Sequence, residues 1–218
     1  MKSVLFVPSQ EKIAVNNIFC IGRNYAAHSK ELGNMPGESP VVFIKPTSSI
    51  VLEGEKIILP KISDDVHHEC EVCLLIGKGG KNIPRSASLD HLLGYGIGLD
   101  LTMRDVQSEA RAKGLPWTIS KGFDTSAAIS SFVAREEISD PSHIEFTLHV
   151  NSELRQKGDT SLMLFPIPFI ISYLSSIFTL ERGDIIFTGT PEGVAAIESG
   201  DRLELRLADR LSCVFDVS

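Results

Sequence analysis

The sequence is poor in the residues that mark several classes of protein. Its four cysteines are not spaced like a disulfide framework, which indicates reduced thiols and a cytoplasmic protein. Lys and Arg form no cluster and the formal net charge is −7, so neither a nucleic-acid surface nor an anionic membrane surface is expected. No apolar run approaches the roughly 20 residues of a membrane span. The short apolar stretch before Pro8 predicts a first strand rather than a signal peptide.

The rest of the composition is that of a folded globular protein. Hydrophobic residues make up 43% of the chain and charged residues 22%, an ordinary balance for such proteins. The 218 residues are enough to bury one large core, and we expect a single domain over residues 1–218.

Strand patterns dominate the chain. Stretches rich in β-branched residues, alternating in polarity and bounded by Gly, Pro or Asp, predict strands over 41–45, 56–60, 70–77, 94–102, 144–150, 184–189, 202–207 and 211–217. Helices are expected over 24–32, 86–93, 104–113 and 167–177. Because strands outnumber helices and do not alternate with them, the pattern favours a β-rich α+β fold over a doubly wound α/β fold. The first helix is expected to pack as a lid.

Residues 67–77, HHECEVCLLIG, raise the question of a metal site. One alternative is a zinc site built from His67, His68, Cys70 and Cys73. On a strand, however, residues three apart point to opposite faces, and no second cysteine pair follows. Zinc is therefore the less favoured interpretation.

The carboxylates of the same stretch predict a different metal. Glu69 and Glu71 are two apart, so on a strand they project from one face, at the mouth of an apolar run that predicts burial on both faces. Asp100 ends a second apolar run, 94–99, in a similar position. Three carboxylates would suit Mg²⁺ or Mn²⁺, with Ca²⁺ possible in crystals. Spacing alone leaves open whether the three converge.

Other polar residues are candidates for catalysis or substrate binding. His28 and Glu31, three apart on the predicted lid helix, could form a dyad that deprotonates water, although a solvated helix shows the same pattern. A helix leaving Asp100 could aim Arg104 and Gln107 at one site, where an arginine can clamp a carboxylate. Two predicted loops carry the remaining candidates: Lys121 stands beside a glycine, and Thr190 lies in a stretch with Gly and Pro, which lets backbone N–H and hydroxyl groups face a ligand.

Together these stretches resemble the fumarylacetoacetate hydrolase family, in particular its small branch that is similar to acylpyruvate hydrolases and oxaloacetate decarboxylases. The motifs that carry the resemblance occur in the family's order over most of the chain. They are Gly22-Arg-Asn-Tyr-Ala-x-His28, His68-Glu-x-Glu71, Gly98-Leu-Asp100-x-Thr-x-Arg104-Asp-x-Gln107, Trp117-x-x-x-Lys121-x-Phe-Asp124, Val150-Asn-x-Glu153-x-Arg155-Gln156 and Gly183-Asp-Ile-Ile-x-Thr-Gly-Thr190-Pro.

The resemblance implies a fold and a set of residue roles. The fold would be a mixed β-sandwich roll with few helices, usually a homodimer. Mg²⁺ or Mn²⁺ would be held by Glu69, Glu71 and Asp100. Water would be activated by His28 and Glu31, and Lys121 would stabilise developing negative charge. The substrate, a small 2-oxo acid, would be bound by Arg23, Arg104, Gln107 and Thr190.

The activity implied by the resemblance is metal-dependent hydrolysis of a C–C bond in acylpyruvates, which are 2,4-dioxo acids such as acetylpyruvate or fumarylpyruvate, through a metal-stabilised pyruvate enolate. Decarboxylation of oxaloacetate and keto–enol tautomerisation of oxaloacetate pass through the same enolate and stay open as alternatives. A non-catalytic metal- or metabolite-binding module is the alternative outside the enzymes. The pair His28 and Glu31, with Lys121, favours catalysis because binding alone would not need these groups.

Overall fold

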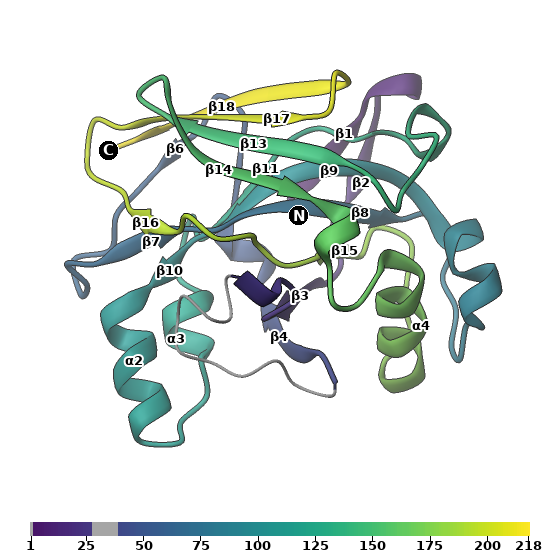
Figure 1. Cartoon of the computed structure of the whole chain (residues 1–218), viewed down its shortest axis with the longest axis horizontal. Helices are drawn as coiled ribbons and strands as arrows, with labels where there is room; N and C mark the ends of the chain where they lie inside the picture. The colour runs from purple at the N-terminus through teal and green to yellow at the C-terminus, as the bar shows by residue number, and fades with distance from the viewer. Residues whose placement is uncertain (1, 28–38) are drawn as a thin grey trace.

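A computed structural model describes residues 2–27 and 39–218 of the chain (Figure 1). The predicted lid helix lies mostly outside these ranges, and so do His28 and Glu31. The strands are β1 (Ser3–Phe6), β2 (Glu11–Ala14), β3 (Ile18–Gly22), β4 (Val41–Lys45), β5 (Ile50–Leu52), β6 (Lys56–Ile57), β7 (Val66–His68), β8 (Cys70–Ile76), β9 (Leu92–Asp100), β10 (Thr102–Met103), β11 (Ala127–Ile129), β12 (Val133–Ala134), β13 (Glu145–Val150), β14 (Glu153–Asp159), β15 (Ile185–Phe187), β16 (Ala195–Ala196), β17 (Arg202–Leu207) and β18 (Leu211–Val217).

The largest sheet is mixed. Within the described residues it has eight strands, in the order β4-β3-β15-β8-β9-β11-β5, with β12 paired to β9 off this path. The pairs β15–β3 and β11–β5 are parallel, whereas β8 pairs antiparallel with both β9 and β15. A second sheet, β14-β13-β17-β18-β6, lies above the first in Figure 1. The arrangement confirms the predicted β-rich mixed sandwich roll.

The large sheet is covered on both faces. On one face, Val72 and Leu74 of β8 belong to the same apolar core as Phe146 and Leu205 of the second sheet. On the other face, the alternate residues Cys73 and Leu75 pack in a second core with Val4, Phe132 and Phe187. Every residue of β8 is buried, as the apolar pattern of this stretch predicted.

The helices lie at the lower edge of the view in Figure 1, α2 and α3 on one side and α4 on the other. Their bounds are α2 (Arg104–Ala112), α3 (Thr118–Lys121) and α4 (Ile167–Ile177), and short 3-10 turns are η1 (Val7–Ser9), η2 (Thr47–Ser49), η3 (Arg85–His91), η4 (Arg135–Glu137) and η5 (Thr160–Leu162). Helix α2 has Asp105 in its first turn and Arg111 in its last, which complements the helix dipole. It ends before Gly114, whose φ is +66°.

Most predicted elements occur close to their predicted bounds, and one is wrong. The strands over 41–45, 202–207 and 211–217 and the helix over 167–177 match β4, β17, β18 and α4. The helix predicted over 86–93 is instead the 3-10 turn η3 followed by β9. Here Leu92 pairs with Ile76, and this long-range strand pairing outweighs a weak local helix propensity.

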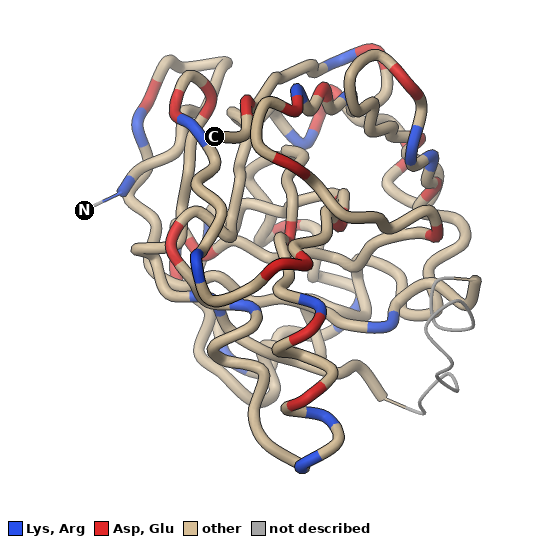
Figure 2. Tube along the Cα trace, turned by 90° about the vertical axis from the view of Figure 1, so that its left-hand side faces the viewer, with Lys and Arg blue, Asp and Glu red and all other residues tan. Residues whose placement is uncertain are grey.

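The charged residues of both signs are distributed over the fold. In Figure 2 acidic and basic residues alternate along the trace, without a long run of either sign. Within the described residues, no helix is both long enough and apolar enough to cross a membrane.

Candidate metal centre and active site

Glu69, Glu71 and Asp100 converge at one end of β8 and β9. Each offers a carboxylate oxygen, and these oxygens all lie within 4.8 Å of one another. All three residues are buried, with at most 5% of their surface exposed. The spacing of the two glutamates predicts that they share one face of a strand. The structure adds the third acid, whose position depends on the pairing of β8 with β9.

The pairing of β8 with β9 brings Asp100 to the glutamates. Glu71 lies opposite Gly98 in the ladder, and the Asp100 amide donates to the carbonyl oxygen of Glu69 at 2.9 Å. A Cβ atom at Gly98 would lie 2.5 Å from the carbonyl oxygen of Ala128, so only glycine permits this close approach of strands. The glycine at position 98 therefore serves the packing of the strands.

Two cations contact the triad from α2 and α3. The Lys121 ammonium donates to Oε2 of Glu69 and to Oδ2 of Asp100, both at 2.7 Å. Arg104 donates to Oε1 of Glu69 at 2.5 Å and to Oε1 of Gln107 at 2.6 Å. Burial alone would lower the pKa of Lys121, but the charges of Asp100 and Glu69 outweigh it, and this pKa is raised.

Glu71 carries the least compensated charge of the three acids. Its Oε2 accepts a hydrogen bond from the Gly189 amide at 2.6 Å. Burial, followed by repulsion from Asp100 and Glu69, raises the pKa of Glu71 well above its usual value. A cation bound beside this carboxylate would favour its ionised form.

Asp100 leaves one oxygen available to a cation. The Lys45 ammonium lies 2.8 Å from Oδ1 of Asp100 but donates its hydrogen bonds to the carbonyl oxygens of Leu101, Lys121 and Ser126. The contact with Lys45 is therefore electrostatic, and Oδ1 is a buried acceptor that has no hydrogen bond among the described residues. An orphaned oxygen among three carboxylates fits a hard divalent ion such as Mg²⁺ or Mn²⁺.

Thr190 is held beside the triad by a residue of the second sheet. Its hydroxyl donates to the carbonyl oxygen of Cys70 and accepts from Nε2 of Gln156, both at 2.8 Å. Gln156, on β14, also accepts from the Cys70 amide at 3.0 Å and bonds Nδ1 of His68 at 2.9 Å. Burial, opposed by the bond to Gln156, lowers the pKa of His68 to about 4, so this imidazole is neutral near pH 7.

The predicted substrate-binding residues lie around this centre. Arg104 and Gln107 both project from α2, as predicted, although the carboxylate that Arg104 contacts here is that of Glu69. Its Nε atom is buried and has no hydrogen-bond partner within the described ranges. Arg23 directly follows β3, and its guanidinium lies over the ring of Trp117, 5.8 Å from the centroid. Their roles toward substrate stay predictions, as does the dyad of His28 and Glu31.

The zinc alternative is wrong for the residues that the structure describes. Cys70 and Cys73 point into the two different cores, as expected for residues three apart on a strand. His67 bonds Asp65 at 2.8 Å, and His68 bonds Gln156. Within the described ranges, the triad is the one cluster of His, Cys, Asp or Glu that could hold a metal.

Two residues of the site were missed in the sequence. Lys45 ends an apolar strand just before Pro46, and a lysine on the inward face of such a strand is a weak sign of a buried ion pair. Gln156 was part of a quoted motif but received no role, because its partners lie 34 to 88 residues away in the chain.

Comparisons with known proteins show which family the chain resembles. The family model described as fumarylacetoacetate (FAA) hydrolase C-terminal matches residues 17–217. The protein named oxaloacetate tautomerase FAHD1, mitochondrial, is 47% identical in Mus musculus over 92% of this chain and 91% of that protein. Its Arabidopsis thaliana counterpart is 46% identical over 92% of this chain and 90% of that protein. The crystal structure of fumarylpyruvate hydrolase from Pseudomonas aeruginosa, in complex with Mn²⁺ and pyruvate, superposes with a TM-score of 0.93 at 37% identity, covering 99% of this chain and 94% of that one.

Proposed function

The chain belongs to the fumarylacetoacetate hydrolase family, and from this premise we propose that it hydrolyses the C–C bond of acylpyruvates through a pyruvate enolate. The observation that carries the proposal is the buried triad of Glu69, Glu71 and Asp100 with Lys121 bonded to two of its members. Such a centre can bind the oxygens of a 2-oxo acid and stabilise an enolate. A fumarylpyruvate hydrolase of the same fold supports this substrate class.

The triad would hold Mg²⁺ or Mn²⁺, and the Mn²⁺ in the fumarylpyruvate hydrolase structure supports such a cofactor. A bound ion of this kind supplies Lewis acidity toward a 2-oxo acid. The protein's own contribution is to keep three carboxylates together in a buried place. Lys45, Lys121 and Arg104 offset their mutual repulsion.

In the proposed reaction, water adds to the acyl carbonyl carbon distal to the 2-oxo acid. We assign the removal of the water proton to His28 and Glu31. The C–C bond then breaks, the electron pair stays with the pyruvate fragment as an enolate, and protonation gives pyruvate beside a carboxylic acid. Lys121 would stabilise the enolate oxygen, because its ammonium already bridges two carboxylates at this point.

A second candidate is keto–enol exchange of oxaloacetate, which needs only proton transfer through the same type of enolate. The observation that favours it is the 46–47% identity to relatives named oxaloacetate tautomerases. Loss of CO₂ from oxaloacetate would reach the enolate as well. These reactions share the centre and differ in whether water must attack.

A substrate panel tests the proposal. The purified protein with Mg²⁺ is assayed for turnover of acetylpyruvate, fumarylpyruvate and oxaloacetate. We expect hydrolysis of the acylpyruvates, and we expect His28→Ala to lower their kcat/KM by about 10²-fold, as for loss of a general base. Oxaloacetate exchange without any hydrolysis would replace the first candidate by the second. If none of the three compounds is turned over, both candidate activities are rejected and a non-catalytic binding module is the alternative that stays.

We propose a single catalytic domain, a homodimer and a cytoplasmic location as the setting of this activity. All four cysteines are buried and unpaired, which suits a reducing compartment. The relatives named above are called mitochondrial, so fractionation of the cells that make this protein is the direct test.

A further inference from the structure

One cation beside the centre lacks the partner that the others have. Lys45 and Lys121 contact Asp100, and Arg104 contacts Glu69. Arg23 is only partly exposed, yet no carboxylate of the described residues pairs with it. Its guanidinium instead stacks over Trp117. A partly buried arginine with an aromatic platform and no acid is a ready site for an anionic group.

The backbone fixes Arg23 close to the triad. Arg23 has a φ of +61°, in the left-handed region that costs a residue with a side chain about 1 kcal/mol or more. The next residue, the fully buried Asn24, donates to the carbonyl oxygen of Thr188 at 2.7 Å and accepts from the Phe165 amide at 2.7 Å. A Cβ atom on Gly189 would lie 2.6 Å from Cβ of Asn24. The amide of Gly189 donates to Glu71. Arg23 is therefore the chain neighbour of a residue, Asn24, that packs against the glycine bonded to the triad.

An aromatic wall leads from Arg23 to Lys121. Trp117 packs edge-to-face against Phe43, with ring centroids 5.9 Å apart. The ammonium of Lys121 lies 5.0 Å from the Phe43 centroid. Phe43, Trp117 and Lys121 also line one cavity of about 940 Å³. A small ligand held at Lys121 can therefore extend along this wall toward Arg23.

The charges around Arg23 also favour an anion. Burial, together with the charge of Arg111, lowers the pKa of Arg23. Arg111 stands seven residues after Arg104 and four after Gln107 on α2, so these three share one face of the helix. That face therefore carries two arginines, Arg104 and Arg111.

We propose that Arg23 binds the second carboxylate of a dicarboxylic 2-oxo acid whose 2-oxo acid end lies at the triad. The planar guanidinium can donate two parallel hydrogen bonds to a carboxylate, and Trp117 holds it in orientation. The inference rests on the proposed function and narrows its substrate class to molecules with two carboxylates, such as fumarylpyruvate or oxaloacetate, against monocarboxylates such as acetylpyruvate.

Binding of two unreactive five-carbon acids provides the test. Calorimetry on the Mg²⁺-loaded protein compares 2-oxoglutarate with 2-oxopentanoate, which lacks the second carboxylate. We expect the wild type to bind 2-oxoglutarate at least about 30-fold more tightly than 2-oxopentanoate, which is the gain expected from one charge-assisted pair. Arg23→Met should remove this difference in affinity and leave the Kd of 2-oxopentanoate within about 3-fold of the wild-type value. Arg23→Lys keeps the positive charge but not the planar guanidinium, so it should retain part of the difference. Arg210→Met, at an exposed turn, is the matched control.

The outcomes separate the inference from the proposed function. A wild type without preference for 2-oxoglutarate overturns the inference, and this result needs no variant to fold. If Arg23→Met loses affinity for both acids equally, the inference is also overturned, because the arginine would then support the whole site and not a second carboxylate. If Arg23→Met loses the preference for 2-oxoglutarate and the wild type turns over no substrate of the panel, the carboxylate subsite at Arg23 is supported and the proposed hydrolase activity is rejected. In the assay itself, Arg23→Met should lower kcat/KM for fumarylpyruvate far more than for acetylpyruvate.

Discussion

The ammonium of Lys45 lies 2.8 Å from Oδ1 of Asp100, and the ammonium of Lys121 lies 2.7 Å from Oδ2 of the same carboxylate. Asp100 is thus held between two buried cations, one from β4 and one from α3. Lys45 also donates to three carbonyl oxygens and so fastens β4 to the segments that carry Asp100 and Lys121. These contacts give Lys45 a positioning role in the centre.

Lys45→Met should strongly destabilise the protein, because it removes three hydrogen bonds from the ammonium to carbonyl oxygens and one charge from a buried pair. Breaking such a pair costs about 3–5 kcal/mol. Urea unfolding of the metal-free protein measures this loss. Lys113→Met removes an exposed pair with Glu109 and should change the unfolding free energy by less than about 1 kcal/mol. Equal effects of the two substitutions would show that Lys45 has no special place in the structure.

Glu71→Gln should abolish metal binding while sparing the fold. We expect Mn²⁺ affinity, measured by calorimetry, to fall by about 10²-fold or more. Because the pKa of Glu71 is raised in the folded state, its contribution to stability is present at low pH and is lost as pH rises through the folded pKa. The metal-free variant should therefore gain stability over the wild type as pH increases above the usual range of a glutamate.

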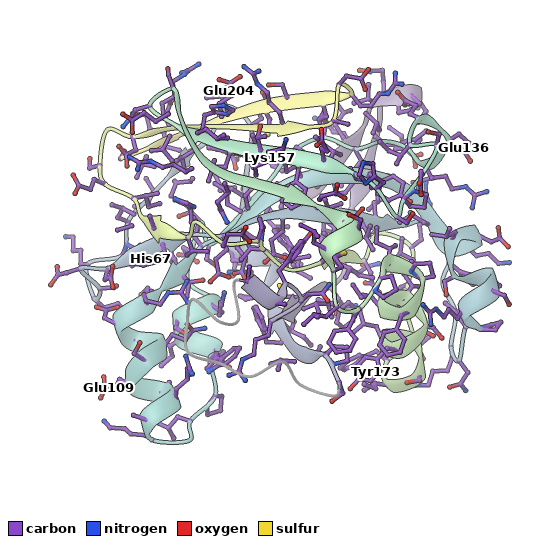
Figure 3. All side chains as sticks on the ribbon, viewed as in Figure 1. His67, Glu109, Glu136, Lys157, Tyr173 and Glu204 are labelled. Atoms are coloured by element: carbon purple, nitrogen blue, oxygen red, sulfur yellow. The ribbon has the colours of Figure 1, made fainter. Side chains whose placement is uncertain are left out.

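Glu109→Gln is the control for that substitution. Glu109 lies on the outer side of α2, away from the sheets (Figure 3). The Glu109→Gln variant should keep wild-type Mn²⁺ affinity. Unchanged Mn²⁺ binding by Glu71→Gln would remove Glu71 from the ligand set.

His68 should make the fold sensitive to acid. Its pKa is lowered to about 4 by burial, so the folded state binds its proton less readily than the unfolded state does. Stability from this residue is complete above the unfolded value of about 6.5 and is lost as pH falls toward 4, by on the order of 3 kcal/mol. In urea titrations, His68→Gln should flatten this part of the pH profile. A variant with the wild-type slope would contradict the assignment.

Gln156→Glu, a substitution on the second sheet, should weaken substrate binding at the active site. The carboxylate cannot donate to Thr190 or to the carbonyl oxygen of Pro191, and losing these buried bonds costs about 1–3 kcal/mol each. We expect a rise in KM for the 2-oxo acid of about 10-fold or more, because Thr190 moves, with a smaller change in kcat. Gln10→Glu, at an exposed turn, is the control. Unaltered KM in a folded Gln156→Glu protein would deny Gln156 a positioning role.

Much of the fold could be read from local patterns. The two-residue period places Cys70 and Val72 in one core and Cys73 in the other, which is also why Glu69 and Glu71 share a face. The apolar run over 167–177 forms α4 within the predicted bounds, starting directly after Pro166. These properties depend on near neighbours in the chain, which a single sequence displays.

The support of the site could not be read in this way. Nothing local distinguishes Lys45 from an exposed lysine, because its partners are 56 to 81 residues further along the chain. The predicted helix over 86–93 failed for a similar reason, since Leu92 extends β9 by pairing with β8. Among the described residues, Oδ1 of Asp100 has no hydrogen bond and Arg23 has no carboxylate partner, and neither property can be seen before the neighbouring strands and helices are placed.

The bond from the Gly189 amide to Glu71 joins residues 118 positions apart. During synthesis the three acids leave the ribosome long before residue 189 does, and the strand that carries this amide to them, β15, must insert between β3 and β8. Contacts of such long range form slowly. The catalytic centre should therefore be among the last parts of the molecule to assemble, and a nascent chain stalled before residue 185 should hold its acids in water, unable to capture an ion.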